Sequence, residues 1–459
     1  MLFNFKPVTY MLSCRHYALS SFSFLLLLLS SNLAPAQSDH QVRNEFNKII
    51  SPFDLSKTTS RETIDLLNNV LAPHQLIALG ESSHGTKEFN IARGQLIRFL
   101  VTNQGLKTVA METEFSGILE LNSFILNGQE DTSDKALDPD TLLKSAIKNS
   151  SLYGIYKTKE VYDMIQWLRQ YNITKPADQR VSLIGFDMQD ASSIANVILK
   201  DSLLMKADSP AKVEDLKNLK KKYWEVNTAD LTKTEASTYE KLIQYLYNLT
   251  ETNGARLSPD FRQYVRILEQ SLILRGRSMP LNKYRQLRDQ FSAENVLWLF
   301  KTKSRDSKMA ILAHNGHIAH ASLSKTERMG YHLQKELGKK YFALAMAFDQ
   351  GDVRIFDFKN ERRYRPFFFP SATDRNSVEF FFKDLKYDTF LLNFTDVRSN
   401  ELLTDMLNKK NQMRVIGATD NDGTNQNYSR VPLLESFDGI LFFKKTTAAV
   451  NLFDYKPKN

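Results

Sequence analysis

Residues 75–114, QLIALGESSHGTKEFNIARGQLIRFLVTNQGLKTVAMETE, decide the fold. Two short apolar runs, Gln75–Leu79 and Thr108–Met111, enclose the stretch Phe89–Asn103, in which apolar residues recur at helical spacing. An apolar run without alternation is typical of a strand that is covered on both faces, as in a parallel sheet. The segment therefore predicts a β-α-β unit and an α/β fold.

Similar apolar runs continue along the chain. Each is rich in Val, Ile, Leu or Phe, and helix-periodic sequence separates most of them. The further candidate strands are Val181–Ile184, Met309–Leu312, Phe342–Met346, Thr389–Leu392 and Ile440–Phe443. We expect a mostly parallel central sheet flanked by helices.

Residues from 191 to 300 interrupt this alternation. They are typical of consecutive helices with charged faces, among them Lys212–Tyr223, Ser237–Leu249 and Arg262–Leu274. We therefore expect an α/β core built from residues 37–190 and 301–459, with residues 191–300 as a helical insertion or cap.

The first 36 residues differ from the rest of the chain. They contain Lys6 and Arg15, no acidic residue, the apolar run Phe22–Leu29 and the small-residue sequence Ala34-Pro35-Ala36. This order is typical of a secretory signal peptide, and the apolar run is too short to span a bilayer. We expect residues 1–36 to be removed and the protein to be exported to the periplasm or secreted.

Composition excludes several classes of protein. The chain has 459 residues, of which 42% are hydrophobic and 25% charged, as in a globular protein with an ample core. Its single cysteine, Cys14, excludes an internal disulfide.

The charge of the chain is mildly positive. The loss of Lys6 and Arg15 with the leader would lower the formal net charge from +9 to +7. We interpret the one dense basic run, Lys217–Lys222, as the solvated face of a helix, because no stripe of basic and stacking residues accompanies it. No segment after the leader offers ~18 uncharged apolar residues. The sequence therefore predicts neither a nucleic-acid partner nor stable membrane insertion.

Polar residues, all but Gln189 of them ionisable, follow four of the predicted strands, at the point where each strand ends. They are Glu81 and His84 after the first strand, Glu112 after the second, Asp187 and Gln189 after the third, and His314 and His317 after the fourth. Ligands of open α/β sheets bind at the carboxyl ends of the strands. We therefore expect these side chains to meet in one crevice.

A histidine backed by a carboxylate would supply acid-base chemistry there. An imidazole with an unperturbed pKa of about 6.5 takes a proton from water near neutral pH, and a carboxylate behind it fixes the tautomer. His84 with either Glu81 or Glu112 would form such a pair. The chain has no Gly-x-Ser-x-Gly motif and no Gly-x-Gly-x-x-Gly or Walker A sequence, and the leader holds its only cysteine. The sequence therefore predicts water as the nucleophile.

Two other functions stay open. The candidate residues Glu81, His84, Glu112, His314 and His317 include enough nitrogen and oxygen ligands for a catalytic zinc or manganese ion, although no His-Glu-x-x-His motif is present. A metal-dependent hydrolase that uses the same residues is therefore one alternative to a cofactor-free enzyme. The other is a non-catalytic binding protein for an envelope glycan or a polyketide.

Several segments match the signature of a known family in colinear order, from roughly residue 45 to 445. The segments are Gly80–Phe89 with Arg93, Val109–Glu112, Lys159–Arg169, Gly185–Gln189, Arg288–Asp289 with Asn295 and Trp298–Leu299, Ala313–Ile318, Met329–Gly330 with Leu333, and Phe437–Ile440. In these residues the chain resembles the erythromycin esterase family. The resemblance implies an α/β core with a helical insertion. It also implies hydrolysis of a small-molecule ester, in the named members the lactone of macrolide antibiotics, by activated water without an acyl-enzyme.

The resemblance also implies roles for individual residues. His84 matches the proposed general base of the family, and Glu81, Arg93 and Glu112 match its supporting charged residues. Arg93 would lie on the first helix, where its guanidinium would pair with Glu112 or steady a developing oxyanion.

The second catalytic histidine of the family falls at His314 or His317. His314 is the first choice because it lies nearer the strand end. Asp187, Gln189 and Arg288 lie in matching segments and are our candidates for substrate binding.

Overall fold

The computed structural model describes residues 40–57, 60–127, 138–201, 210–225, 231–253, 257–275, 279–322, 326–419 and 428–453. The expected leader, residues 1–36, lies outside these ranges, so its removal stays a prediction. Within the described ranges, no helix combines the length and the apolar character needed to cross a bilayer.

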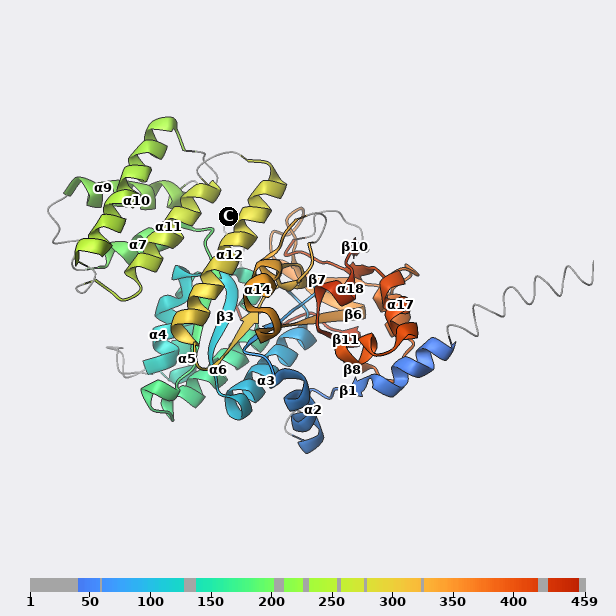
Figure 1. Ribbon diagram of the computed structural model, residues 1–459. Helices are drawn as coiled ribbons and strands as arrows, with labels where there is room; N and C mark the ends of the chain where they lie inside the picture. Colours follow the sequence, from blue (N-terminus) through green and yellow to red (C-terminus); the bar gives the residue numbers. More distant parts are fainter. Residues whose placement is uncertain are drawn as a thin grey trace, which may run out of the picture.

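A nine-stranded sheet forms the centre of the described chain (Figure 1). Its strands lie in the order β1-β8-β11-β6-β2-β5-β3-β4, and β7 pairs with the far end of β6. The strands of the sheet are β1 (Ser51–Pro52), β2 (Leu76–Leu79), β3 (Leu106–Glu114), β4 (Ser182–Asp187), β5 (Lys308–Leu312), β6 (Tyr341–Phe356), β7 (Tyr364–Phe369), β8 (Thr389–Asn393) and β11 (Gly439–Thr446). A separate pair is formed by β9 (Gln412–Arg414) and β10 (Tyr428–Arg430).

The six strands from β11 to β4 in this order are parallel to one another. The pairs β1–β8, β8–β11 and β6–β7 are antiparallel. The prediction of an α/β fold with a mostly parallel sheet is confirmed, and all seven expected strands are present. The sequence does not predict β7, because Pro366 lacks a backbone donor and the strand is only partly buried, as is typical of an edge strand.

Helices cover both faces of the sheet. The helices of the core are α2 (Arg61–Leu71), α3 (Lys87–Gln104), α4 (Leu119–Asn127), α5 (Pro139–Asn149), α6 (Lys159–Ile173), α13 (Asn315–Ile318), α14 (Met329–Leu337), α15 (Val378–Phe382), α16 (Phe394–Arg398), α17 (Glu401–Lys409) and α18 (Leu433–Ser436). A short 3-10 helix, η1 (Ser116–Ile118), follows β3. Residues 40–49 form a further helix before β1.

Alternate residues of the central strands pack into two separate hydrophobic cores. Leu76 and Ala78 of β2 lie in the core that includes Leu333 of α14, whereas Ile77 and Leu79 lie in the core that includes Phe89 of α3. Every residue of β2 is therefore buried. The absence of polar positions in this strand follows directly, because neither face meets water.

In the part of the chain that the structure describes, five helices lie between β4 and β5. They are α7 (Ala191–Leu199), α9 (Pro210–Glu225), α10 (Lys233–Asn253), α11 (Phe261–Arg275) and α12 (Leu281–Lys303). In Figure 1, α7, α9, α10 and α11 gather to one side of the sheet, and α12 runs from that group down along β3. The three expected helices lie within α9, α10 and α11.

The helix α12 belongs to the core as much as to this group. Its buried residues Phe291, Val296 and Leu299 lie in the same core as Leu76 and Ala78 of β2. The division of the chain into a core and an insertion at residues 191–300 stays a prediction.

Candidate active site

The carboxyl ends of β2, β5, β3 and β4 lie side by side, because these strands are adjacent and parallel. The loop after β2 carries Glu81 and His84, β3 carries Glu112, β4 ends at Asp187, and His314 follows β5. All five residues are buried. The structure therefore brings together side chains that are up to 233 residues apart in the sequence.

His84 is paired with Glu81. The Nδ1 atom of His84 lies 2.8 Å from Oε1 of Glu81, and the Tyr156 hydroxyl donates to the same oxygen at 3.3 Å. Burial opposes ionisation of Glu81, but Arg93 and His84 together lower its pKa below the ordinary value. Because an ionised carboxylate only accepts hydrogen bonds, Nδ1 of His84 carries the proton and Nε2 is left as an acceptor.

Arg93 holds Glu81 from behind. Its Nη1 atom lies 2.5 Å from Oε2 of Glu81, and Nη2 donates to the carbonyl oxygens of Leu79 at 3.0 Å and Ala313 at 2.6 Å. The expected pairing of Arg93 with Glu112 is wrong. The guanidinium is fully engaged with a carboxylate and with the ends of β2 and β5, so it fixes the histidine loop from inside the protein.

Two glycines let the loop from Gly80 to Gly85 pass close to its neighbours. A Cβ atom on Gly80 would lie 2.1 Å from the side-chain oxygen of Asn315. A Cβ atom on Gly85 would lie 1.8 Å from the backbone carbonyl oxygen of Arg354 in β6. A side chain at either position would therefore displace the loop that carries Glu81 and His84.

His314 is a buried, neutral imidazole. It caps α13, and its Nδ1 atom accepts a hydrogen bond from the backbone N–H of Gly316 at 3.1 Å. Burial and the neighbouring His84 lower the pKa of His314 to about 3. Nε2 therefore carries the proton, and no residue in the described part of the chain accepts it.

The rings of His84 and His314 lie beside each other, with 5.2 Å between their centroids. The tautomer set by Glu81 makes Nε2 of His84 an acceptor, and Nε2 of His314 is an N–H donor without a protein partner in the described part of the chain. An isolated buried donor is costly, so this N–H is expected to meet a ligand or water.

His317 is held between two carboxylates. Its Nδ1 atom lies 2.5 Å from Oδ1 of Asp289, and its Nε2 atom lies 3.2 Å from Oε1 of Glu112. Burial disfavours the charged ring, but Asp289 and Glu112 raise the pKa of His317 to about 10. His317 is therefore an imidazolium at neutral pH, and carboxylates occupy both of its nitrogens.

Glu112 connects this imidazolium to the rest of the site. Its Oε1 atom accepts a hydrogen bond from Nη2 of Arg288 at 3.0 Å, and its Oε2 atom accepts one from the backbone N–H of His314 at 3.0 Å. Burial raises the pKa of Glu112, but His317 and Arg288 lower it well below the ordinary range. Glu112 is thus a fixed anion that positions the second histidine.

The three candidates for substrate binding form one network. Arg288 of α12 binds Asp187 through Nη2 at 2.5 Å, and Gln189 donates to the same carboxylate oxygen at 2.8 Å. The Arg288 side chain keeps 17% of its surface exposed. Arg288 and Gln189 are therefore the two members of the trio that a ligand can reach, whereas the fully buried Asp187 holds them in place.

Other members of the network are not predicted by the sequence. The Tyr153 hydroxyl donates to Glu114 at 2.5 Å and also lies 3.1 Å from Asp187. Burial and the nearby Asp187 raise the pKa of Glu114 to about 8. Tyr153 lies in a segment without periodicity, so no pattern identifies it. Asp289 directly follows Arg288 in the sequence, and this adjacency to a predicted site residue is the one sequence feature that could have identified it as part of the site.

The carboxylates of the site are already neutralised by protein cations. Glu81 pairs with Arg93, and Glu112 and Asp289 pair with His317. In the part of the chain that the structure describes, no group of three or more His, Cys, Asp or Glu side chains is arranged to hold a metal ion.

The fold and this geometry define a class of protein. A mostly parallel α/β sheet presents a histidine–carboxylate pair and a second, neutral histidine at its carboxyl edge, which is the arrangement of an enzyme that moves protons at a bound ligand. The particular family follows from sequence comparison. Residues 101–446 match the profile described as erythromycin esterase, and the chain belongs to the erythromycin esterase family.

Relatives of known sequence and structure agree with this assignment. The chain is 24% identical over 323 residues to erythromycin esterase type II of Escherichia coli, which covers 61% of this chain and 70% of the relative. The chain has the fold of a Bacillus cereus protein of known structure, with a TM-score of 0.75, 21% identity and coverage of 90% of this chain and 99% of the other. It also resembles a mutant erythromycin esterase crystallised in its open conformation, with a TM-score of 0.62, 18% identity and coverage of 88% and 99%. The resemblance found in the sequence is confirmed, and the chain is a hydrolase of the erythromycin esterase type.

Proposed function

We propose that the protein hydrolyses an ester or lactone by means of a water molecule that His84 activates. The observation that carries this proposal is the pair of neighbouring rings, in which Nε2 of His84 is an acceptor and Nε2 of His314 is a donor, 5.2 Å apart between centroids. A water on the first nitrogen and a carbonyl oxygen on the second would bring nucleophile and electrophile together.

The reaction runs in two proton transfers. His84 takes a proton from water, and the water oxygen bonds to the carbonyl carbon while the electrons of the C=O bond move to its oxygen. The N–H of His314 stabilises that oxyanion. The intermediate then expels the alkoxide, which receives the proton back from His84, so that an acid and an alcohol leave the site.

Glu81 stabilises the imidazolium that forms on His84 during the reaction. Arg93 keeps Glu81 ionised, since it binds the oxygen that His84 does not use. This arrangement lets the base gain and lose a proton without moving its carboxylate partner.

His314 is the better candidate than His317 for the second histidine. Both nitrogens of His317 face carboxylates, so the ring has no free atom for a substrate. A neutral N–H donor, kept neutral by burial, acts on a carbonyl without first releasing a proton. His317 and Glu112 then act as positioning residues behind it, and Arg288 holds Glu112 from the side that a ligand reaches.

We propose a macrolide-like lactone as the substrate, because relatives in the family are named erythromycin esterases. Residues 1–36 are proposed to direct export, which would place the enzyme where antibiotics enter. Amino-terminal sequencing of the protein recovered from cells tests the export proposal, with Gln37 as the expected first residue.

A panel of macrolides and simple lactones tests the reaction. The purified protein is incubated with each compound, with and without a chelator. Mass spectrometry then shows whether the mass of the lactone has increased by that of one water molecule. His84→Gln is expected to abolish the gain, and His332→Gln, a matched change at a histidine of α14 that pairs with Glu327, is expected to leave it unchanged. Loss of activity on chelation would favour a metal-dependent hydrolase, and saturable binding without product would favour a binding protein.

A further inference from the structure

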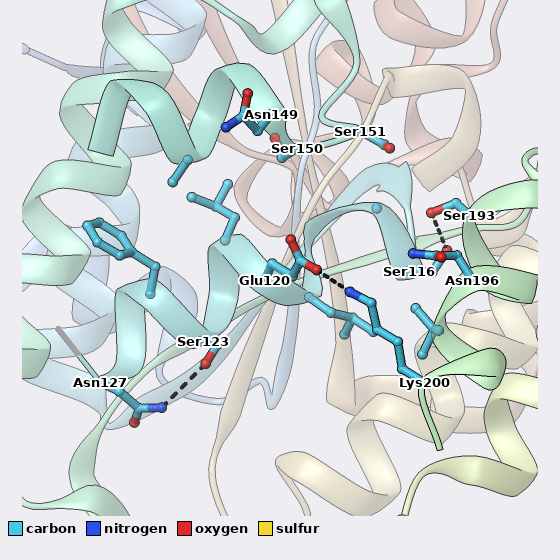
Figure 2. A pocket seen from close by; sticks show the side chains of 16 residues that line it. Ser116, Glu120, Ser123, Asn127, Asn149, Ser150, Ser151, Ser193, Asn196 and Lys200 are labelled. Carbon is cyan, nitrogen blue, oxygen red and sulfur yellow. Dashed lines mark hydrogen bonds and ion pairs between the residues drawn. The ribbon is translucent and has the colours of Figure 1, made fainter. Parts of the chain in front are cut away.

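A cavity of about 750 Å³ lies beyond the end of β3, between η1, α4, α5 and α7. Eight of the sixteen residues that line it are serine or asparagine. Figure 2 shows these side chains around the cavity, with Ser116 and Ser193 hydrogen-bonded to each other across the two segments that carry them. We call this cavity the serine–asparagine pocket.

The lining of the serine–asparagine pocket is polar but carries little net charge. Its two charged side chains, Glu120 and Lys200, form an ion pair at 2.5 Å. Its one aromatic ring, Phe124, is covered by the guanidinium of Arg169 at 4.6 Å. An apolar ligand would leave the hydroxyls and amides unpaired, and a nucleic acid would find no open aromatic surface on which its bases could stack.

A second cavity of about 460 Å³ continues from the first and shares Ser151, Ser193 and Asn196 with it. Its far wall is formed by Lys217, Lys220 and Lys221 of α9. Together the two cavities form a groove with hydroxyls and amides at one end and ammonium groups at the other.

One hydrogen bond orients the Asn196 side chain in the middle of this groove. Lys220 donates from Nζ to the Oδ1 atom of Asn196 at 2.8 Å, which leaves the amide N–H₂ of Asn196 as the free end. Serine hydroxyls and asparagine amides both donate and accept hydrogen bonds, as sugar hydroxyls do. Three lysines and one carboxylate residue, Asp190, line the other end, so the net positive charge there complements an anionic substituent.

The groove also adjoins the candidate active site. Ser151 lies two residues before Tyr153, whose hydroxyl contacts Glu114 and Asp187. Asp190, which lines the second cavity, donates its backbone N–H to Glu114 at 3.1 Å. A long ligand in the groove would therefore lie next to the network that holds Arg288.

We propose that this groove binds a carbohydrate chain with acidic substituents. The sugar hydroxyls bind the serine and asparagine side chains of the first cavity, and the acidic groups bind the lysines of α9. The contacts depend on neither histidine of the candidate active site, so the binding is separable from the hydrolysis proposed above.

Titration calorimetry with the inactive His84→Gln chain tests the proposal. The probes are an alginate hexasaccharide, which carries uronic acids, and maltohexaose, which is neutral. We expect the alginate to bind, with weakening at higher salt, and maltohexaose to bind at least about tenfold more weakly.

Three variants locate the binding. Asn196→Leu and, separately, the exposed-surface pair Lys217→Glu with Lys221→Glu are each expected to weaken alginate binding at least about tenfold, whereas Lys409→Glu on α17 leaves it unchanged. The charge-reversal pair keeps the proposal testable if Asn196→Leu fails to fold. Absence of alginate binding, equal binding of the two probes, or binding that the α9 variant leaves unchanged would each overturn the proposal, whether or not the parent protein hydrolyses a lactone.

Discussion

The substitution Asp289→Asn tests the charge of His317. In the parent protein Asp289 lies 2.5 Å from Nδ1 of His317, and with Glu112 it raises the pKa of that ring from 6.5 to about 10. An opposite charge at this distance is worth about 1–3 pKa units, so the variant should titrate at about 7 to 9. Glu112 remains in place and prevents a return to the ordinary value.

The same change alters how stability depends on pH. Because folding raises the pKa of His317, its stabilising contribution is complete below the ordinary pKa of 6.5 and is lost as the pH rises through about 10. At about 1.36 kcal/mol per pKa unit, that contribution is about 4 to 5 kcal/mol in the parent. Asp289→Asn should reduce it by about 1 to 4 kcal/mol and flatten the decline in unfolding free energy at alkaline pH.

Proton–carbon NMR of the histidine rings measures the pKa of His317. Urea unfolding at a series of pH values between the ordinary pKa of 6.5 and the folded pKa of about 10 measures the stability. The variant His317→Gln assigns the signal, and Glu327→Gln, which removes an exposed carboxylate beside His332, serves as the matched control. A His317 signal that titrates near its ordinary value in the parent protein, or that Asp289→Asn leaves in place, would refute the reasoning.

Three further changes probe other contacts. Arg93→Leu leaves Glu81 buried without its cation and should cost about 3–5 kcal/mol in urea unfolding; a cost below about 1 kcal/mol would contradict the pairing. Gly85→Ala forces a Cβ atom to within 1.8 Å of the Arg354 carbonyl and should lower kcat for lactone opening by about 100-fold through displacement of the histidine loop, so a parental kcat would argue against that constraint. Folding raises the pKa of Glu114 to about 8, so unfolding free energy should fall as the pH rises from 4.5 to 8; Glu114→Gln should remove that decline, and a decline of unchanged size would assign it to other groups.

The sheet could be predicted because its central strands are buried on both faces. Runs such as Leu76–Leu79 contain no polar position, and the helix after them ends at Gln104, close to the expected end at Asn103, with Gly105 capping it at a φ of 69°. The direction of each strand, in contrast, could not be predicted from its sequence. An apolar run does not say which way its neighbour runs, so Thr389–Asn393 reads like the parallel strands although it pairs antiparallel with β11.

The position of the site could be predicted from the strand ends, whereas its pairings could not. Sequence places His84 near both Glu81 and Glu112, but only the course of the loop decides that Glu81 is the partner. Arg93 has a side chain long enough to reach either carboxylate. The rotation of α12 about its axis decides that Asp289 faces His317, and no pattern along the sequence records that angle.

The central claim is that His84 and His314 act together on one water and one carbonyl. A double-mutant cycle measures this most directly, from single-turnover rates of lactone opening by the parent protein, His84→Gln, His314→Gln and the double variant. We expect each single change to slow the reaction by about 10²–10⁴-fold and the double variant to be scarcely slower than either. A His84→Gln variant that is folded and opens the lactone at the parental rate would contradict the account.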